Sequence, residues 1–161
     1  MAMATYLQSV SSDELAALEA KPETVNQLDQ PVCCATHLAC SMNYFLTGDA
    51  YPSPEDHALA ALLFGARSVD APTLENGAFG VVDPADVAAL IKALEAVDFD
   101  ALRDSIEDAD LQELVEEEEL YELEVMEPDE VPEQLVNDLQ TVLEFYRNVA
   151  AENGAVVSYT T

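Results

Sequence analysis

The sequence feature that most constrains the fold is the negative charge of the chain. It has 33 Asp and Glu residues against 5 Lys and Arg residues, which gives a formal net charge of −28 at pH 7. Repulsion between so many like charges opposes compaction, so a folded state must keep its carboxylates in water, where salt screens them. Half of the 161 residues are hydrophobic, which is unlike a disordered chain and is enough for a core at this length. We therefore expect one folded domain over residues 1–161 with an acidic surface.

The spacing of apolar residues predicts an α+β fold that is predominantly helical. Residues 5–10 and 155–159 have strand character, and we expect these two ends of the chain to pair in one small sheet. Helix-start signals occur at Ser11 with Glu14, at Ser53 with Pro54, and at Asp83 with Pro84. The predicted helices cover residues 12–20, 33–46, 53–65, 84–97, two segments around 99–106 and 111–115, and 131–151. We expect a linker at 22–31, a loop at 66–77 and a short strand at 78–82.

The negative charge is concentrated in one segment. Residues 98–138 hold 18 acidic residues and a single basic residue, Arg103, in 41 positions. The apolar residues of this segment keep a helical spacing, which predicts an acidic face on folded helices and not a flexible tail. We predict that a partner binds the densest part of this face, which comprises Glu113, Glu116, Glu117, Glu118, Glu119, Glu122, Glu124, Glu127, Asp129 and Glu130.

Solubility alone is the simplest explanation of such a face, but the excess of charge exceeds what solubility needs. A net charge of about 2–8 keeps a small domain soluble. Like charges three or four residues apart destabilise a helix by a few tenths of a kcal/mol per pair, and no lysine offsets the run from Glu116 to Glu119. A partner that neutralises the charge would explain the excess, and so would a high-salt environment that screens it.

Three cysteines, Cys33, Cys34 and Cys40, lie close together with His37 among them. Their spacing differs from that of a zinc finger, and their odd number argues against a disulfide framework. We expect small cysteines packed in a core helix, no bound metal and no cofactor. The chain shows neither a signal peptide nor an apolar run of 18 residues. These features predict a protein of a reducing compartment, the cytoplasm.

The sequence gives little support to an enzymatic function. A cysteine nucleophile needs an electropositive site that lowers the pKa of its thiol, and this chain is strongly acidic. Only five glycines and five basic residues are present, and no glycine-rich phosphate loop is visible. His57 is interpreted as a lone surface histidine. We therefore predict a non-catalytic protein.

Several short motifs resemble the YfbM-like bacterial family, a domain of unknown function. They lie at Tyr6 with Ser12-Asp13-Glu14-Leu15, at Asn43-Tyr44-Phe45-Leu46-Thr47-Gly48, at residues 60–65, at Val82-Asp83-Pro84-Ala85-Asp86-Val87, and from Phe145-Tyr146 to Gly154-Ala155-Val156-Val157. The resemblance implies a compact α+β fold. It implies no activity, because the family has no settled one, although some members look like immunity proteins beside bacterial toxins. The chain departs from the family pattern around His37 to Asn43 and at residues 121–124.

The acidic face leads to three hypotheses about function. Such a surface repels nucleic acid and anionic membranes and attracts basic proteins. The first hypothesis is an immunity or inhibitor protein, a monomer or one half of a 1:1 complex, that covers the basic site of a toxin or enzyme. The second is a nucleic-acid mimic, of phage type, that blocks a DNA- or RNA-binding protein. The third is a housekeeping protein of a salt-adapted organism.

Overall fold

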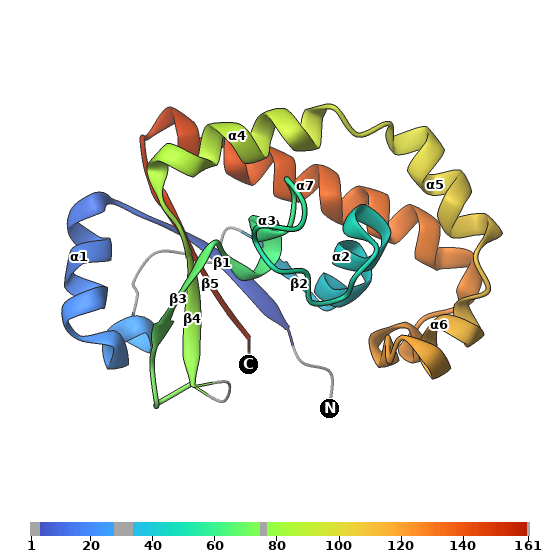
Figure 1. The fold of residues 1–161 in the computed structure, drawn as a ribbon, viewed down its shortest axis with the longest axis horizontal. Helices are drawn as coiled ribbons and strands as arrows, with labels where there is room; N and C mark the ends of the chain where they lie inside the picture. Colours follow the sequence, from blue (N-terminus) through green and yellow to red (C-terminus); the bar gives the residue numbers. More distant parts are fainter. Residues whose placement is uncertain (1–3, 28–33, 75–76, 161) are drawn as a thin grey trace.

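A five-stranded antiparallel sheet forms the centre of the protein (Figure 1). The computed structural model describes residues 4–27, 34–74 and 77–160. The strands are β1 (Thr5–Val10), β2 (Cys34–Thr36), β3 (Arg67–Asp70), β4 (Ala78–Val82) and β5 (Ala155–Thr160), in the spatial order β2-β1-β5-β4-β3. Strands β1 and β5 pair over their full lengths, from Thr5 opposite Thr160 to Val10 opposite Ala155. The predicted pairing of the two ends of the chain is therefore confirmed, within a wider sheet.

Helices make up most of the remaining described chain. They are α1 (Ser12–Ala20), α2 (Ala39–Thr47), α3 (Ala61–Phe64), α4 (Pro84–Glu95), α5 (Phe99–Asp108), α6 (Leu111–Glu117) and α7 (Val131–Ala151), with 3-10 turns η1 (Pro22–Gln27), η2 (Tyr121–Val125) and η3 (Pro128–Glu130). Helix α7 packs against α4 and α5. In Figure 1, α5 and α6 lead away from the sheet to the side of the molecule opposite α1. The α+β class and the helical majority predicted from the sequence are confirmed.

The sheet is covered on both faces. Leu7 and Val156 point into the larger core, which is built around the buried face of α7. Val10 and Val157, at positions of opposite parity, point into a smaller core with Leu15 and other residues of α1 and η1. This alternation along β1 and β5 is the two-residue period of a strand, and it places α1 and α7 on opposite faces of the sheet.

Local capping signals explain the confirmed helix boundaries. Ser11 and Glu14 form the predicted capping box, because the Ser11 side chain accepts from the Glu14 N–H and the Glu14 carboxylate accepts from the Ser11 N–H. Gly48 ends α2 with a φ of 89°, a left-handed conformation that glycine adopts without strain. Helix α7 begins and ends at the residues predicted from its apolar period.

The helix predicted over residues 33–46 is wrong in its first half. Residues 34–36 form β2 at the edge of the sheet, where Tyr6 of β1 lies opposite Ala35, and α2 begins only at Ala39. A three-residue strand carries no periodicity of its own, so its conformation is decided by the neighbouring strand. Cys33 lies outside the described residues. The linker predicted at 22–31 is also wrong in part, since residues 22–27 form η1.

The helix predicted over residues 53–65 is mostly a series of turns. The His57 Nδ1 accepts from the Leu59 N–H at 3.0 Å, and this local side-chain bond competes with helical hydrogen bonding. Only α3 is helical. The loop predicted at 66–77 contains β3, whose largely exposed side chains hide the usual alternation of a strand. The short strand predicted at 78–82 is confirmed as β4.

Candidate functional site at the acidic end

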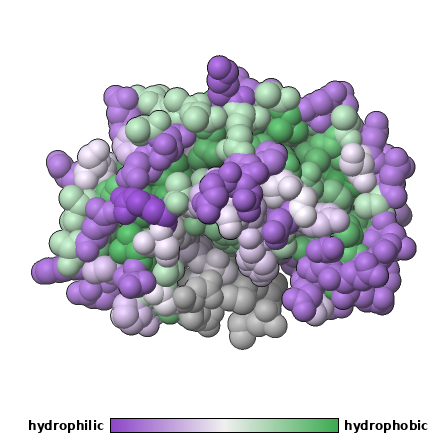
Figure 2. Space-filling view, in the orientation of Figure 1, coloured by the Kyte–Doolittle hydropathy of each residue, from purple (hydrophilic) through white to green (hydrophobic). Residues whose placement is uncertain are grey.

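Helices α5 and α6 with η2 and η3 form one end of the molecule, which we call the acidic end. Of the 18 acidic residues between positions 98 and 138, all are exposed except Glu122 and Asp138, which are partly buried. Figure 2 shows a dense hydrophilic patch at the lower right, where Figure 1 places α6 and the turn that follows it. The remaining 120 residues carry 15 acidic residues. The charge is therefore concentrated at this end and is not spread evenly.

Part of the acidity here serves the helices themselves. The Asp98 carboxylate accepts from the backbone N–H groups of Asp100 and Ala101, both at 3.1 Å, and so caps α5. The Asp110 carboxylate caps α6 by accepting from the Glu113 N–H at 3.2 Å. Capping with a negative side chain satisfies free N–H groups and complements the helix dipole. These contacts explain two of the acidic residues and leave most of the others without a structural role.

Apolar residues attach the acidic end to the core. Leu102 and Ile106 of α5, Val115 of α6 and Leu123 of η2 are buried in the same core as α7. The carboxylates on the opposite sides of these elements are therefore held on an ordered surface. This is the arrangement that the helical spacing of the segment predicted.

The predicted partner-binding residues fall into two groups. Glu122 turns inward, as described below. The other nine lie exposed on α6, on the turn that follows it, on η2 and η3, or beside them: Glu113, Glu116, Glu117, Glu118, Glu119, Glu124, Glu127, Asp129 and Glu130. Their role in binding stays a prediction.

Glu122 supplies the N-terminal cap of another helix. Its Oε1 accepts from the Ser41 backbone N–H at 2.5 Å and from the Ser41 hydroxyl at 2.7 Å. Leu38, at the N-cap position of α2, offers no side-chain acceptor, so the glutamate from η2 takes that place. Burial raises the pKa of Glu122, against the lowering effects of the hydrogen bonds from α2 and of the nearby His37. No pattern in the sequence indicates this role, because the two partners are 81 residues apart.

A second carboxylate holds the same stretch of chain. The Thr36 hydroxyl donates to Asp138 Oδ2 of α7 at 3.1 Å and accepts from the Leu38 N–H at 3.0 Å. Gln134 donates to the other oxygen of Asp138 at 2.7 Å. The two partly buried acids of the acidic segment therefore bind on either side of the connection between β2 and α2, Asp138 at Thr36 of β2 and Glu122 at Ser41 in the first turn of α2.

The exposed run on α6 pays an electrostatic cost. Repulsion from Glu117, and to a lesser extent from Asp110, raises the pKa of Glu113. Glu119, which follows the helix, has a φ of 58°, a left-handed conformation that is unfavourable for a residue with a side chain. A glycine at this position would avoid the strain. The glutamates on α6 and the turn after it therefore lower the stability of the fold in two ways, through repulsion at Glu113 and through an unfavourable backbone conformation at Glu119.

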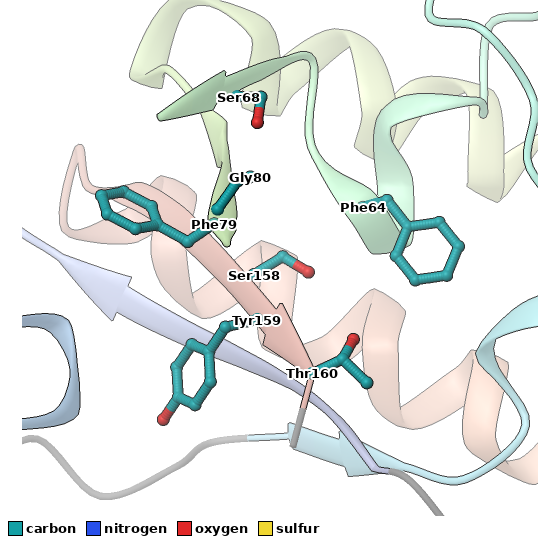
Figure 3. Close-up of a pocket in the computed structure, with 8 residues that line it drawn as sticks. Phe64, Ser68, Phe79, Gly80, Ser158, Tyr159 and Thr160 are labelled. Carbon is teal, nitrogen blue, oxygen red and sulfur yellow. The ribbon is translucent and has the colours of Figure 1, made fainter. Parts of the chain in front are cut away.

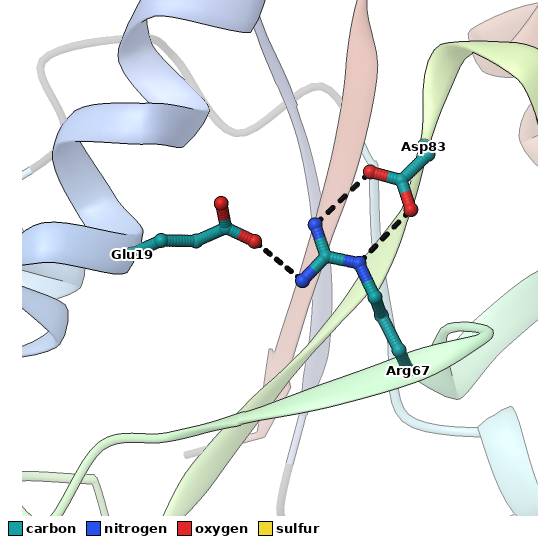
Figure 4. A network of polar contacts seen from close by, with 3 residues as sticks. All are labelled: Glu19, Arg67 and Asp83. Atoms are coloured by element: carbon teal, nitrogen blue, oxygen red, sulfur yellow. Dashed lines mark hydrogen bonds and ion pairs between the residues drawn. The ribbon is translucent and has the colours of Figure 1, made fainter.

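Outside the acidic end, two of the four basic side chains, Arg67 and Arg147, form ion pairs with nearby acids. Arg67 of β3 donates to both carboxylate oxygens of Asp83, at 2.9 and 3.0 Å, and forms an ion pair with Glu19 of α1 (Figure 4). Arg147 of α7 lies 3.1 Å from Glu95. At the acidic end the single base, Arg103, approaches a carboxylate no closer than 3.8 Å. The field of the acidic end is therefore largely unbalanced by neighbouring bases.

Cys40, Tyr51 and Glu122 meet where α2 faces η2. Burial raises the pKa of the Cys40 thiol, and the carboxylate of Glu122 adds to that rise while a hydrogen bond with Tyr51 opposes it. The same hydrogen bond is the main cause that raises the pKa of Tyr51 to about 12. A thiol kept protonated is a poor nucleophile and a poor metal ligand. Among the described residues, no group of three or more His, Cys, Asp and Glu side chains is arranged to hold a metal ion.

A small pocket lies in the sheet, apart from the predicted site residues. Its volume is about 150 Å³, and it opens where β4 and β5 separate beyond the pair of Gly80 with Ser158 (Figure 3). The Ser158 hydroxyl in its wall donates to the Leu63 carbonyl at 2.5 Å, so that group is already used in the fold. Pockets that bind drug-sized ligands measure about 300–1,000 Å³, and this one is smaller.

The fold and the candidate site together define the class of this protein, which is an α+β protein with a covered antiparallel sheet and an ordered acidic end. The chain belongs to the family described as a domain of unknown function, DUF1877, which matches residues 40–159. Among solved structures, the crystal structure of YfbM from Escherichia coli, a protein of unknown function, is similar, with a TM-score of 0.76 and 17% sequence identity over 98% of this chain and 99% of that chain. The resemblance to the YfbM-like family is therefore confirmed. No curated protein matches the sequence.

At 17% identity the solved structure shows a shared fold and nothing about the acidic end. Within the described part of the chain, none of the helices has the length and apolar character needed to cross a membrane.

Proposed function

We propose that the protein is a non-catalytic binding protein that docks its acidic end on a basic partner protein, as an immunity or inhibitor protein that covers the positively charged site of a toxin or enzyme. Unpaired carboxylates on a rigid surface attract such a partner at long range and fix its orientation. The proposed complex is 1:1 and forms in the cytoplasm. The same surface repels nucleic acids and anionic membranes.

The observation that carries the proposal is the cost of keeping glutamates on α6 and the turn after it. Glu119 adopts a left-handed conformation that a glycine would adopt more easily, and Glu113 is repelled by its neighbours. Strain and repulsion at an exposed site bring the isolated protein no benefit, and such outliers occur at functional sites. Solubility or adaptation to salt is served equally well by carboxylates anywhere on the surface, whereas here 18 of the 33 lie in 41 residues.

The environment of the cysteine supports the non-catalytic part of the proposal. Cys40 is partly buried, and its thiol has a raised pKa beside an acidic residue, which is the opposite of a reactive cysteine. Nucleic-acid mimicry would use the same acidic end, and it is distinguished by the partner: in that case duplex DNA or RNA competes for the complex.

The experiment compares two variants of equal net charge. One replaces Glu116, Glu117, Glu118 and Glu119 with Gln, and the control replaces exposed acids outside the acidic end, Asp13, Glu23, Asp86 and Glu152, with Asn or Gln. Basic proteins are captured from cell lysate at low and high salt, and association rates are then measured by stopped flow with the purified partner. We expect the first variant to associate at least ~10-fold more slowly and the control to stay within about twofold. Equal slowing of both variants, or the absence of a saturable 1:1 complex, would refute the proposal.

The Glu119→Gly variant tests directly whether the left-handed conformation of Glu119 costs stability and whether its carboxylate serves binding. Relief of the left-handed strain is expected to raise the free energy of unfolding by up to ~1 kcal/mol, while loss of the carboxylate slows association. Asn153, which has a φ of 54° after α7, provides the matched control, because asparagine tolerates this conformation. Asn153→Gly should change stability less and leave association unchanged. A Glu119→Gly protein that is less stable, or that associates at the normal rate, contradicts the argument.

A further inference from the structure

Large apolar side chains are exposed mainly at one edge of the acidic end. In the described part of the chain these are Tyr51, Tyr121 and Val125, with exposed fractions of 73%, 58% and 73%. Tyr121 and Val125 belong to η2. The segment that carries Tyr51 and η2 both contact α2, because Asn43 of α2 donates to the Ala50 carbonyl at 3.3 Å and Ser41 of α2 donates to Glu122 of η2. The charges of Glu122 and Glu119 also contribute to the raised pKa of Tyr51. Exposed aromatic residues with a charged surround are typical of protein-binding surfaces.

Tyr51 is held in a fixed position although it is exposed. Its ring stacks on Phe64 of α3, with 6.0 Å between ring centroids and 14° between planes. Its backbone N–H donates to Asp49 Oδ1 at 2.9 Å, and the Asn43 side chain of α2 donates to the carbonyl of the preceding residue, Ala50, at 3.3 Å. A ring fixed from three directions loses little conformational entropy on binding. Phe64 covers one face of the Tyr51 ring, and the rest of the ring is exposed and therefore available to a ligand.

We infer that the edge formed by Tyr51, Tyr121 and Glu119 is a docking site for an arginine side chain of the basic partner. This inference rests on the proposed function, and it specifies one contact at the centre of the proposed interface. The guanidinium group stacks on the open surface of a tyrosine ring, and its N–H groups donate to the Glu119 carboxylate. Charge complementarity selects the occupant, since the carboxylates around these rings disfavour an apolar or acidic segment.

Arginine fits this edge better than lysine for reasons of shape and hydration. Its guanidinium is planar, stacks on aromatic rings and pairs with a carboxylate through two N–H groups, whereas the lysine ammonium is a strongly hydrated point charge. Tyrosine and arginine are also the residues that dominate the energy of protein interfaces, commonly at their centres. The acidic run on α6 then attracts the partner, and the aromatic edge selects which basic residue binds.

The test uses two probes of equal charge, octa-arginine and octa-lysine peptides, titrated calorimetrically against the protein of residues 1–161 at low salt. We expect the wild-type protein to bind octa-arginine roughly 3–10-fold more tightly. Tyr51→Leu should abolish this preference without changing the affinity for octa-lysine by more than about twofold. Tyr51→Phe, which keeps the ring, should retain the preference. Tyr6→Leu, a change in a stacked pair of β1 and β5, should also retain it, and circular dichroism verifies that each variant is folded.

The outcomes separate the inference from the proposed function. Equal affinity of the wild-type protein for both peptides, or equal weakening of both by Tyr51→Leu, would overturn the arginine site and leave the proposed function standing. If neither peptide binds the wild-type protein, both the arginine site and the proposed function are overturned. Loss of the preference in the Tyr6→Leu variant would show that it does not depend on the aromatic edge, and would also overturn the inference.

Discussion

Two glutamates three residues apart have opposite roles at the acidic end. Glu122 points inward and accepts two hydrogen bonds from Ser41 at the N-terminus of α2, where a negative cap is favourable. Glu119 points outward from a left-handed backbone position, and the structure gives it no comparable internal task. Residues of the same type in one acidic run therefore contribute differently, and the tertiary contact of each decides whether it stabilises the fold.

The cap predicts a difference between neighbouring alanine variants. Glu122→Ala leaves the Ser41 N–H and hydroxyl without their acceptor and is expected to lower the free energy of unfolding by about 1–3 kcal/mol. Glu124→Ala, at an exposed position of the same 3-10 turn, is expected to change it by less than about 0.5 kcal/mol. Urea denaturation followed by circular dichroism measures both. Equal effects of the two variants would mean that the cap contributes nothing.

At the scale of elements, α3 illustrates a helix that depends on its neighbours. It has four residues, too few for an isolated helix. The buried Tyr146 hydroxyl of α7 donates to the Leu62 carbonyl at 2.6 Å, and Ser158 of β5 donates to the Leu63 carbonyl. Gly80 of β4 allows the end of α3 to approach, because a Cβ there would lie 1.9 Å from the Phe64 carbonyl oxygen. Three other elements thus fix this short helix.

Tyr146→Phe tests this dependence. Removal of the hydroxyl leaves the Leu62 carbonyl without that donor, and we expect the free energy of unfolding to fall by about 1–3 kcal/mol. The comparison is Tyr121→Phe, which removes a hydroxyl from an exposed ring and should cost less than about 0.5 kcal/mol. Thermal and urea unfolding give the two values. A Tyr146→Phe protein as stable as the wild type would show that water replaces the hydroxyl.

Elements with strong local signals could be predicted from the sequence, and those decided by distant contacts could not. Helix α7 has a long apolar period, and α4 has a proline at its first position. Strand β2 is defined by its pairing with β1, and β3 is an exposed edge strand. The acidic face was visible in composition. The cap by Glu122 and the position of Tyr51 were not, because both depend on contacts between segments far apart in sequence.

The whole molecule carries its charge unevenly, and this makes its stability depend on pH. Burial raises the pKa of Glu122, and repulsion raises that of Glu113, so both take up protons more readily in the folded state than in the unfolded chain. Stability linked to these groups increases as pH falls through their raised pKa values. Arg67 lowers the pKa of Asp83, and the stability linked to that group is lost when pH falls through its lowered pKa.

We therefore expect stability to be greatest at mildly acidic pH. The free energy of unfolding should rise from pH 7 towards about pH 4–5, near the unfolded pKa of glutamate, and fall below that as the Asp83 carboxylate is protonated. Urea unfolding at pH 7, 5 and 3 measures the profile. Salt at pH 7 should reproduce part of the gain by screening. A steady fall in stability from pH 7 to pH 5 would contradict this account of the acidic end.

The place of β5 in the sheet has a consequence for how the chain folds during its synthesis. Strand β5 lies between the pair β2-β1 and the pair β4-β3, and it comes last in the described sequence. A ribosome releases the other four strands first, so two separate ribbons with unpaired inner edges must wait for the final strand. The five strands form one sheet only after β5 has been added, and until then those edges are available to chaperones or to neighbouring nascent chains.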